Sequence, residues 1–438
     1  MTARLRAWLE ALGDQFWLRP ALIILLSLGL GQAAIWLEGA DVAGHGLSSG
    51  NWGYSGGAEG ARALLSAVAS STIGVAGTTF SITIAALSLA SGQMGPRLLR
   101  NFVRDSRNQI ALGIFLGTFA YALIVLRTVR TVEEAQFVPH LAVTGAIMLA
   151  LLCLGTLVWF VHHIATSINV ETVVDEVHHD LCKAIDDRTL DKPDVQPPAL
   201  PIDGRPVSVT ESQFLQAIDD AQLADYAHEH GVNLRLRVRP GDYVHHGAPV
   251  AEVSEAVEGV GEALDRALTF GRRTVALQDL EYSIRQLSEI AVRALSPGIN
   301  DPFTAASVVD RFGDALCRIA PRHLRTGAVA REGRIVLVFP VTDYAGLCDA
   351  MFHMIRQNGV GSAYVLIRML EVLSRVAEVE RLASRRLELR RHADLIMAGV
   401  EAGVTDRAAQ ADAEDRYQAF LATIARAASV ISESRKPL

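Results

Sequence analysis

The chain has 438 residues, half of them hydrophobic, and a formal net charge of -7 at pH 7. This length is enough for a membrane domain and at least one soluble domain, and the acidic excess lies after residue 164, which argues against nucleic acid as a partner. Four scattered cysteines form no C-x-x-C pair and indicate neither a disulfide framework nor a zinc site.

Four apolar segments within residues 1–164 are long enough to cross a bilayer. After an amphipathic lead at 1–19, we expect spans at residues 20–37, 63–90, 109–126 and 141–164. Arginines are concentrated in the lead and in the loop at 91–108, so the positive-inside rule predicts that both termini are cytoplasmic. A secretory signal peptide is the alternative interpretation of the first segment, but the lead is long and contains Glu10 and Asp14. The spans carry no charged residue at their centres, which predicts no proton relay inside the bilayer.

The second span has small and hydroxylated residues along one side. At about 100° per residue, they fall within an arc of about 80°: Ser66, Ser70, Gly74, Gly77, Ser81 and Ser88. Such a face can allow close helix packing, within one subunit or between subunits. It can also line a pore in a ring of identical helices, with Ile84 as a hydrophobic constriction. A second stripe of Thr72, Thr79 and Thr83 lies opposite, where threonines can bond to their own backbone.

We expect this helix to break at Gly92 and at Gly95-Pro96 and to continue as a short basic segment. Spacings of 3, 4 and 3 place its arginines on one helical face, namely Arg97, Arg100, Arg104 and Arg107. An interfacial helix that binds anionic lipid headgroups is the simpler interpretation. In a pore, the same residues would form a cationic vestibule that concentrates anions.

Residues 165–190 predict a helical stalk that continues the fourth span, and residues 191–206, with five prolines, predict a linker. The pairs His162-His163 and His178-His179 do not indicate a metal site, because adjacent residues on a helix point about 100° apart. We therefore expect no metal and no cofactor.

Residues 207–260 predict a small β-rich, barrel-like module. Residues 233–238 alternate as a strand, 240–242 and 246–247 form turns, and 249–253 complete a hairpin-like unit. The segment resembles the half-barrel repeat of biotinyl and lipoyl carrier domains. It has no lysine to carry the modification, because the three lysines are Lys183, Lys192 and Lys436. A scaffold is all that this likeness implies.

Residues 261–360 predict an α+β domain, and residues 361–438 predict two or three C-terminal helices. We expect residues 262–320 to be helical with a break at 295–304, where Asp301 can cap the second helix and Pro302 can take its first position. A catalytic loop containing Ser296, Asn300 and Asp301 is the alternative. A buried strand is expected at 333–341, followed by a helix that Thr342 and Asp343 cap and that ends near residues 358–359.

Two segments carry a family resemblance. One is T-F-S-I-T at 79–83 with L-S-L-A-S-G-Q-M-G-P-R-L-L-R-N-F at 87–102, and the other is R-A-L-S-P-G-I-N-D-P-F-T-A at 293–305. Together they resemble a bacterial family of predicted integral membrane proteins whose domain, number twenty-two fifty-four, has unknown function. The resemblance implies an inner-membrane location and this domain order, and it implies no activity.

The sequence thus predicts an all-α four-helix membrane domain joined to an α+β cytoplasmic domain. The favoured function is a homo-oligomeric ion channel or transport protein in the bacterial inner membrane, anion-biased, with a regulatory or assembly cytoplasmic domain. The alternative is a membrane-anchored sensor or scaffold that binds a ligand or partner and conducts nothing. Phosphate-binding, metalloprotease and serine-hydrolase motifs are missing from the sequence, so we predict that the protein is not an enzyme.

Overall fold

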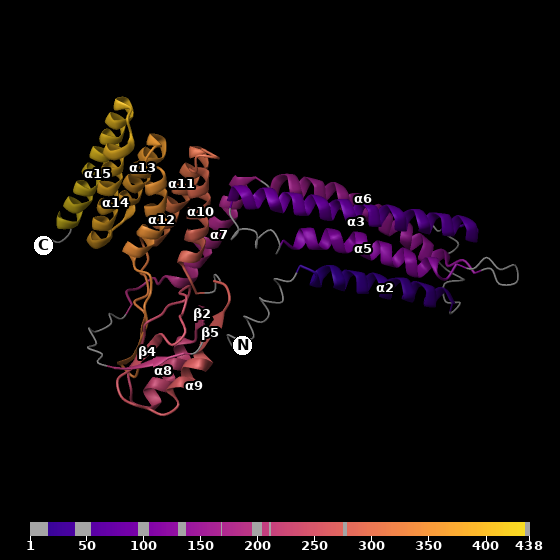
Figure 1. The fold of residues 1–438 in the computed structure, drawn as a ribbon, viewed down its shortest axis with the longest axis horizontal. Helices are drawn as coiled ribbons and strands as arrows, with labels where there is room; N and C mark the ends of the chain where they lie inside the picture. Colours follow the sequence, from indigo (N-terminus) through magenta and orange to yellow (C-terminus); the bar gives the residue numbers. More distant parts are fainter. Residues whose placement is uncertain are drawn as a thin grey trace. The chain divides into compact units, whose positions relative to one another are not determined.

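The computed structural model describes residues 16–39, 54–94, 105–129, 137–167, 169–194, 204–209, 212–274 and 278–433. The chain divides into two compact units, whose described residues lie within 16–169 and within 170–433. We refer to the described parts of these as the membrane unit and the C-terminal unit, and we treat each by itself (Figure 1).

The membrane unit consists of helices that run alongside one another (Figure 1). Their bounds are Leu18–Gly39 (α2), Ala58–Met94 (α3), Ser106–Leu126 (α5) and His140–Ser167 (α6). All four are long and apolar enough to cross a membrane. Helix α5 contacts each of the other three helices, and half of the residues in its apolar segment are buried. The central position of α5 explains why small residues such as Gly113 and Gly117 lie against side chains of α2.

Helix α3 is longer than predicted. It begins at Ala58 and passes Gly92 without a break, ending at Met94. At a rise of about 1.5 Å per residue its length exceeds the thickness of a bilayer core of about 30 Å. A glycine inside a helix costs only about 1 kcal/mol relative to alanine, so a continuous helix can pass through it.

Seven helices of the C-terminal unit pack side by side (Figure 1). They are Val170–Arg188 (α7), Glu281–Ala294 (α10), Pro302–Ile319 (α11), Tyr344–Asn358 (α12), Ala363–Val379 (α13), Ala383–Gly403 (α14) and Arg407–Glu433 (α15). Large apolar side chains such as Phe312, Phe352 and Phe420 are fully buried among them. The stalk differs from the expected single helix, because α6 ends at Ser167 and α7 begins at Val170.

The strands form two sheets. The larger has the order β1-β4-β3-β7-β6, in which only β3 and β7 are parallel. Its strands are Arg205–Ser208 (β1), Leu234–Leu236 (β3), Pro249–Val253 (β4), Ala328–Arg331 (β6) and Arg334–Val338 (β7). The smaller sheet pairs Phe214–Ile218 (β2) with Leu268–Gly271 (β5). Helices Asp220–Glu229 (α8) and Val260–Ala267 (α9) share an apolar core with both sheets.

The expectation of a barrel-like module is not confirmed. The described strands make an open sheet with edges at β1 and β6. The reason is the parallel pairing of β3 with β7, which comes from about 100 residues further along the chain. The β-rich segment at 207–260 therefore completes its sheet with strands from outside that segment, and the resemblance to a carrier half-barrel describes only its local turns.

Two helix starts follow the sequence closely. Asp301 caps α11, with Oδ1 accepting from the backbone amides of Phe303 and Thr304, both at 3.1 Å, and Pro302 is the first helical residue. Asp343 caps α12 by accepting from the amide of Gly346 at 2.8 Å. Both cases satisfy an amide that the helix leaves without an internal partner.

Candidate functional site

The small-residue face of α3 lies on the surface of the membrane unit. All six small residues of this face, which we call the α3 seam, are exposed: Ser66, Ser70, Gly74, Gly77, Ser81 and Ser88. A Cβ atom added at Gly74 or Gly77 would meet no atom within 4 Å. Ile84 is 48% exposed on the same helix. Among the described residues, no other helix of the membrane unit covers the seam, which favours contact with another subunit or with water over packing inside this unit.

The opposite face of α3 packs inside the unit. Thr72, Thr79 and Thr83 are buried, and α3 contacts α5 and α6. Thr72 Oγ1 donates to the carbonyl of Val68 at 2.8 Å, and Thr83 Oγ1 donates to that of Thr79 at 2.8 Å. Threonines that bond to their own helix can face an apolar neighbour without exposing a free hydroxyl. The two faces of α3 thus have different surroundings although both are rich in small polar residues.

Of the predicted basic face, Arg97, Arg100 and Arg104 lie outside the described residues. Arg107 belongs to the first turn of α5, where Asp105 accepts from its backbone amide at 2.9 Å. The guanidinium of Arg107 lies 3.4 Å from Nδ1 of His163, whose Nε2 contacts Asp105 Oδ2 at 2.5 Å. His163 is only 7% exposed and stacks on Trp159.

The loop with Ser296, Asn300 and Asp301 has a structural role. Ser296 Oγ donates to the carbonyl of Arg293 at 2.6 Å, which closes the end of α10. Asn300 has a φ of 50°, a left-handed conformation that asparagine tolerates better than most residues, and Asp301 caps α11. These contacts account for the three residues as a helix-to-helix connection. Nothing in them assembles a nucleophile with a base.

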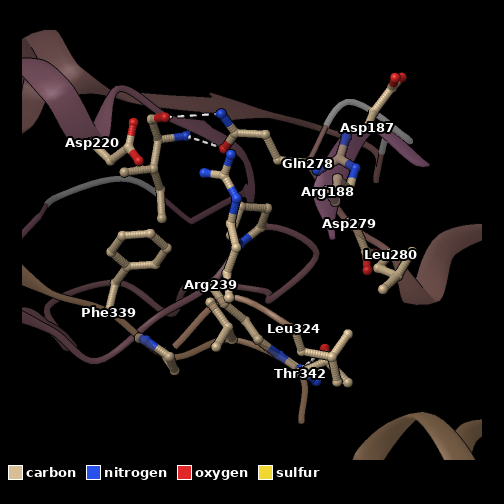
Figure 2. A pocket seen from close by; sticks show the side chains of 15 residues that line it. Asp187, Arg188, Asp220, Arg239, Gln278, Asp279, Leu280, Leu324, Phe339 and Thr342 are labelled. Atoms are coloured by element: carbon tan, nitrogen blue, oxygen red, sulfur yellow. Dashed lines mark hydrogen bonds between the residues drawn. The ribbon is translucent and has the colours of Figure 1, made fainter. Parts of the chain in front are cut away.

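A cavity of about 380 Å³ lies in the C-terminal unit (Figure 2). This volume is within the usual range for small-molecule sites. Its charged lining comes from five separate segments: Asp187 and Arg188 at the end of α7, Asp220 on α8, Arg239 after β3, Asp279 before α10, and Arg325 before β6. Phe339 and Thr342 supply an apolar and a hydroxyl surface. The lining thus combines three carboxylates with three guanidinium groups and can receive a small polar molecule.

Hydrogen bonds fix part of this lining. Gln278 donates to the carbonyl of Ile218 at 2.9 Å and accepts from its amide at 2.8 Å, as the dashed lines in Figure 2 show. Arg239 pairs with Glu281 at 2.8 Å. Burial raises the pKa of Asp279, although its ion pair with Arg285 opposes the shift. Burial lowers the pKa of Arg188. A negatively charged ligand would stabilise the charged form of such a buried guanidinium.

Two groups of titratable side chains among the described residues have the composition of metal sites. The first joins His178 and Cys182 of α7 to Asp314 of α11, and we call it the α7–α11 cluster. The second joins Asp349 and His353 of α12 to His392 of α14, and we call it the α12–α14 cluster. The sequence pattern alone indicates neither group.

The relation between His178 and Cys182 was visible in the sequence as a spacing of four on a predicted helix. The adjacent pair His178-His179 is the more obvious pattern, but its two side chains point about 100° apart. Asp314 lies 132 residues from Cys182, and no spacing in the sequence indicates that contact.

Comparison with known proteins places the chain in a family. A family model described as "Predicted membrane protein (DUF2254)" matches residues 13–375. The chain belongs to this family. The match confirms the resemblance carried by the segments at 79–102 and 293–305.

Uncharacterized proteins of Mycobacterium tuberculosis and Mycobacterium bovis are each 31% identical to this DUF2254 protein over 459 residues. These alignments cover 98% of this chain and 83% of each relative. No solved structure matches the chain. The chain is therefore a predicted membrane protein with bacterial relatives, and the names of these relatives state no substrate or activity.

Proposed function

We propose that this DUF2254 protein forms a homo-oligomer in the bacterial inner membrane, with both termini in the cytoplasm, and that the oligomer conducts or transports ions. In this proposal α3 faces a shared axis, and the C-terminal unit assembles or regulates the complex. The protein is not an enzyme in this proposal. The observation that carries it is the exposure of the whole α3 seam, from Ser66 to Ser88.

The physical argument rests on what a lipid-facing helix needs. Lipid tails form no hydrogen bonds with serine hydroxyls and do not need the small surface at Gly74 and Gly77. A neighbouring helix can pack closely on such a surface, and water can bond to the hydroxyls. Helix α6 provides the contrast within the same unit. Its exposed side chains include Leu151, Leu154 and Val158, which are the large apolar residues expected against lipid.

Anion preference is the finer part of the proposal. It rests on the basic residues that follow α3 in sequence, of which the structure describes Arg107. A cationic entrance raises the local concentration of anions. Reversal potentials in asymmetric chloride should therefore indicate anion over cation permeability, and a cation preference would contradict this part.

The test of assembly is disulfide crosslinking in native membranes. Ser70→Cys and Ser81→Cys should each give crosslinked dimers on oxidation, because seams of neighbouring copies meet at the axis. Leu154→Cys on α6 is a matched control, since Leu154 is 62% exposed but lies on the face assigned to lipid. The unmodified chain, with its four native cysteines, gives the baseline. Equal crosslinking at Leu154 and on the seam would overturn the assigned axis.

The test of conduction is recording from the purified protein in planar bilayers. A thiol reagent should reduce the current of Ser81→Cys and leave that of Leu154→Cys unchanged. Crosslinking on the seam without any current would overturn conduction and support the second candidate.

The second candidate is a membrane-anchored sensor, and the cavity of about 380 Å³, lined by three arginines and three aspartates, favours it. Inorganic phosphate is a suitable first probe. Saturable phosphate binding that Arg239→Ala abolishes would support a ligand site. The matched control is Arg235→Ala, because Arg235 is exposed on β3 and does not line this cavity.

A further inference from the structure

Helices α7 and α11 pack against each other through polar contacts that repeat every three or four residues. Each contact joins one residue of α7 or the turn after it to one of α11 or the turn after it: Glu171 to Ser307, Asp175 to Arg311, Asp186 to Arg318, and Thr189 to Arg322. The repeat corresponds to one face of each helix. Two of these contacts are ion pairs in which an aspartate on α7 binds an arginine on α11.

The α7–α11 cluster interrupts this pattern. Between the two ion pairs, the aspartate is on α11 and the facing residues of α7 are a histidine and a cysteine. His178 Nε2 lies 3.1 Å from Asp314 Oδ2, and Cys182 Sγ lies 3.4 Å from His178 Nε2 and 3.9 Å from Asp314 Oδ2. The three atoms thus converge from two helices on one small volume.

Zinc requires such a convergence. With Zn–S of about 2.3 Å and Zn–N and Zn–O of about 2.0 Å, tetrahedral ligand atoms lie about 3.3 to 3.6 Å apart. The observed separations of 3.1, 3.4 and 3.9 Å differ from these values by only a few tenths of an ångström. We propose that His178 Nε2, Cys182 Sγ and Asp314 Oδ2 bind a Zn²⁺ ion.

The chemistry of the ligands supports zinc over a hard cation. A thiolate and an imidazole are ligands that Zn²⁺ accepts and that Mg²⁺ and Ca²⁺ do not favour. A thiolate and a carboxylate together balance the two charges of the ion. Neighbouring guanidinium groups do not take its place, because Arg311 is bound to Asp175 at 2.7 Å and Arg318 is bound to Asp186 at 2.5 Å.

The exposure of the three residues indicates the type of site. Cys182 is 8% exposed and the side chain of His178 is 17% exposed, whereas that of Asp314 is 61% exposed. The sulfur and nitrogen ligands are thus held inside the helix interface, and the open side is next to the carboxylate. Three protein ligands leave a fourth position for water or another molecule. Helix α7 follows the last span directly in sequence, because it begins three residues after α6 ends. The ion would therefore fix α7 to α11.

The experiment is metal binding by the full chain in detergent after removal of metal with a chelator. We expect one Zn²⁺ per chain. Co²⁺ at the same site should give the absorption band of a thiolate-to-cobalt charge transfer. Cys182→Ser should abolish that band and weaken zinc binding about tenfold or more. Even residues that only hydrogen-bond to metal ligands typically contribute about a tenfold effect on metal affinity.

The control is Cys317→Ser, which removes a thiol from α11 three residues after Asp314. This variant should keep both the charge-transfer band and the stoichiometry. Asp314→Asn provides a second variant on an exposed position, where the fold tolerates the change, and it should weaken binding while the band persists. Failure of the full chain to bind zinc, or loss of the band in Cys317→Ser with retention in Cys182→Ser, would overturn the proposal.

Discussion

The α7–α11 and α12–α14 clusters contain similar groups and differ in one neighbour. In the α12–α14 cluster, Asp349 Oδ1 lies 2.9 Å from His353 Nε2 and 3.1 Å from His392 Nε2. Arg391 also reaches Asp349 Oδ1, at 2.5 Å, and lies 3.3 Å from His392 Nε2. The guanidinium thus occupies the position, and supplies the charge, that a metal ion would have there. In the α7–α11 cluster, the nearby arginines are bound to other aspartates.

The two clusters also differ in burial. His392 is fully buried, and burial, followed by the charges of Arg391 and His353, lowers its pKa to about 4. Burial also lowers the pKa of His178, while the carboxylate of Asp314 raises it in part. In the α12–α14 cluster, Arg391 supplies the positive charge that balances Asp349, so that His392 can stay neutral and structural. In the α7–α11 cluster the neighbouring arginines bind other aspartates, and there we assign the position of the cation to Zn²⁺.

The largest expected effect that separates the clusters is the pH dependence of the α12–α14 region. The pKa of His392 is about 4 when folded and 6.5 as its ordinary value. The folded state binds fewer protons than the unfolded state in this range. The contribution of neutral His392 to the free energy of unfolding is therefore fully present above pH 6.5 and is lost as the pH falls toward 4. From about pH 7.5 to about pH 4.5 we expect a loss of about 2.5 kcal/mol. Hydrogen exchange of α12 and α14 amides, corrected for intrinsic rates, measures it.

His392→Gln is the control for this prediction, because glutamine can donate to Asp349 but does not titrate in this range. The other groups that face His392 are Asp349, His353, Arg391 and the ring of Phe352. If the acid sensitivity of the region is the same in His392→Gln as in the unmodified chain, the loss does not come from His392.

A smaller effect should follow from removing the carboxylate of each cluster in metal-free protein. Asp349→Ala removes the shared acceptor of Arg391, His353 and His392, and hydrogen bonds to charged groups contribute about 2 kcal/mol. Asp314→Ala removes a carboxylate whose side chain is 61% exposed, so we expect less than about 1 kcal/mol. Hydrogen exchange of α12 in one case and of α11 in the other checks the difference. Equal losses would mean that the clusters do not differ as the contacts indicate.

Local rules predicted several helix starts and the apolar helices, although they failed at Gly92, where α3 continues without a break. The break at 295–304, the cap at Asp301 and the cap at Asp343 follow from side chains that bond amides two or three residues away. The four apolar helices likewise follow from length and hydropathy. For the two caps, the sequence contains both partners of the interaction within one turn of a helix.

Long-range contacts explain what the sequence could not predict. The pairing of β3 with β7 and the approach of Asp314 to His178 each join segments more than 100 residues apart. The exposure of the α3 seam is of the same kind, because the sequence indicates a small-residue face but not whether α5 covers it. Only the packing of α5 against the threonine face decides that.

The smallest expected effect concerns Asp301, a third carboxylate, which begins the helix that carries Asp314. Its partners are backbone amides and the hydroxyl of Thr304, so no histidine or arginine depends on it. Asp301→Ala should cost about 1 kcal/mol, and Asp301→Asn should cost little because asparagine caps equally well. Exchange of the first-turn amides of α11 measures both. If the zinc affinity stays constant in both variants, fraying at the start of α11 does not affect the proposed cation site further along the helix. A large loss in Asp301→Asn would instead point to a role of the charge itself, as the catalytic-loop alternative requires.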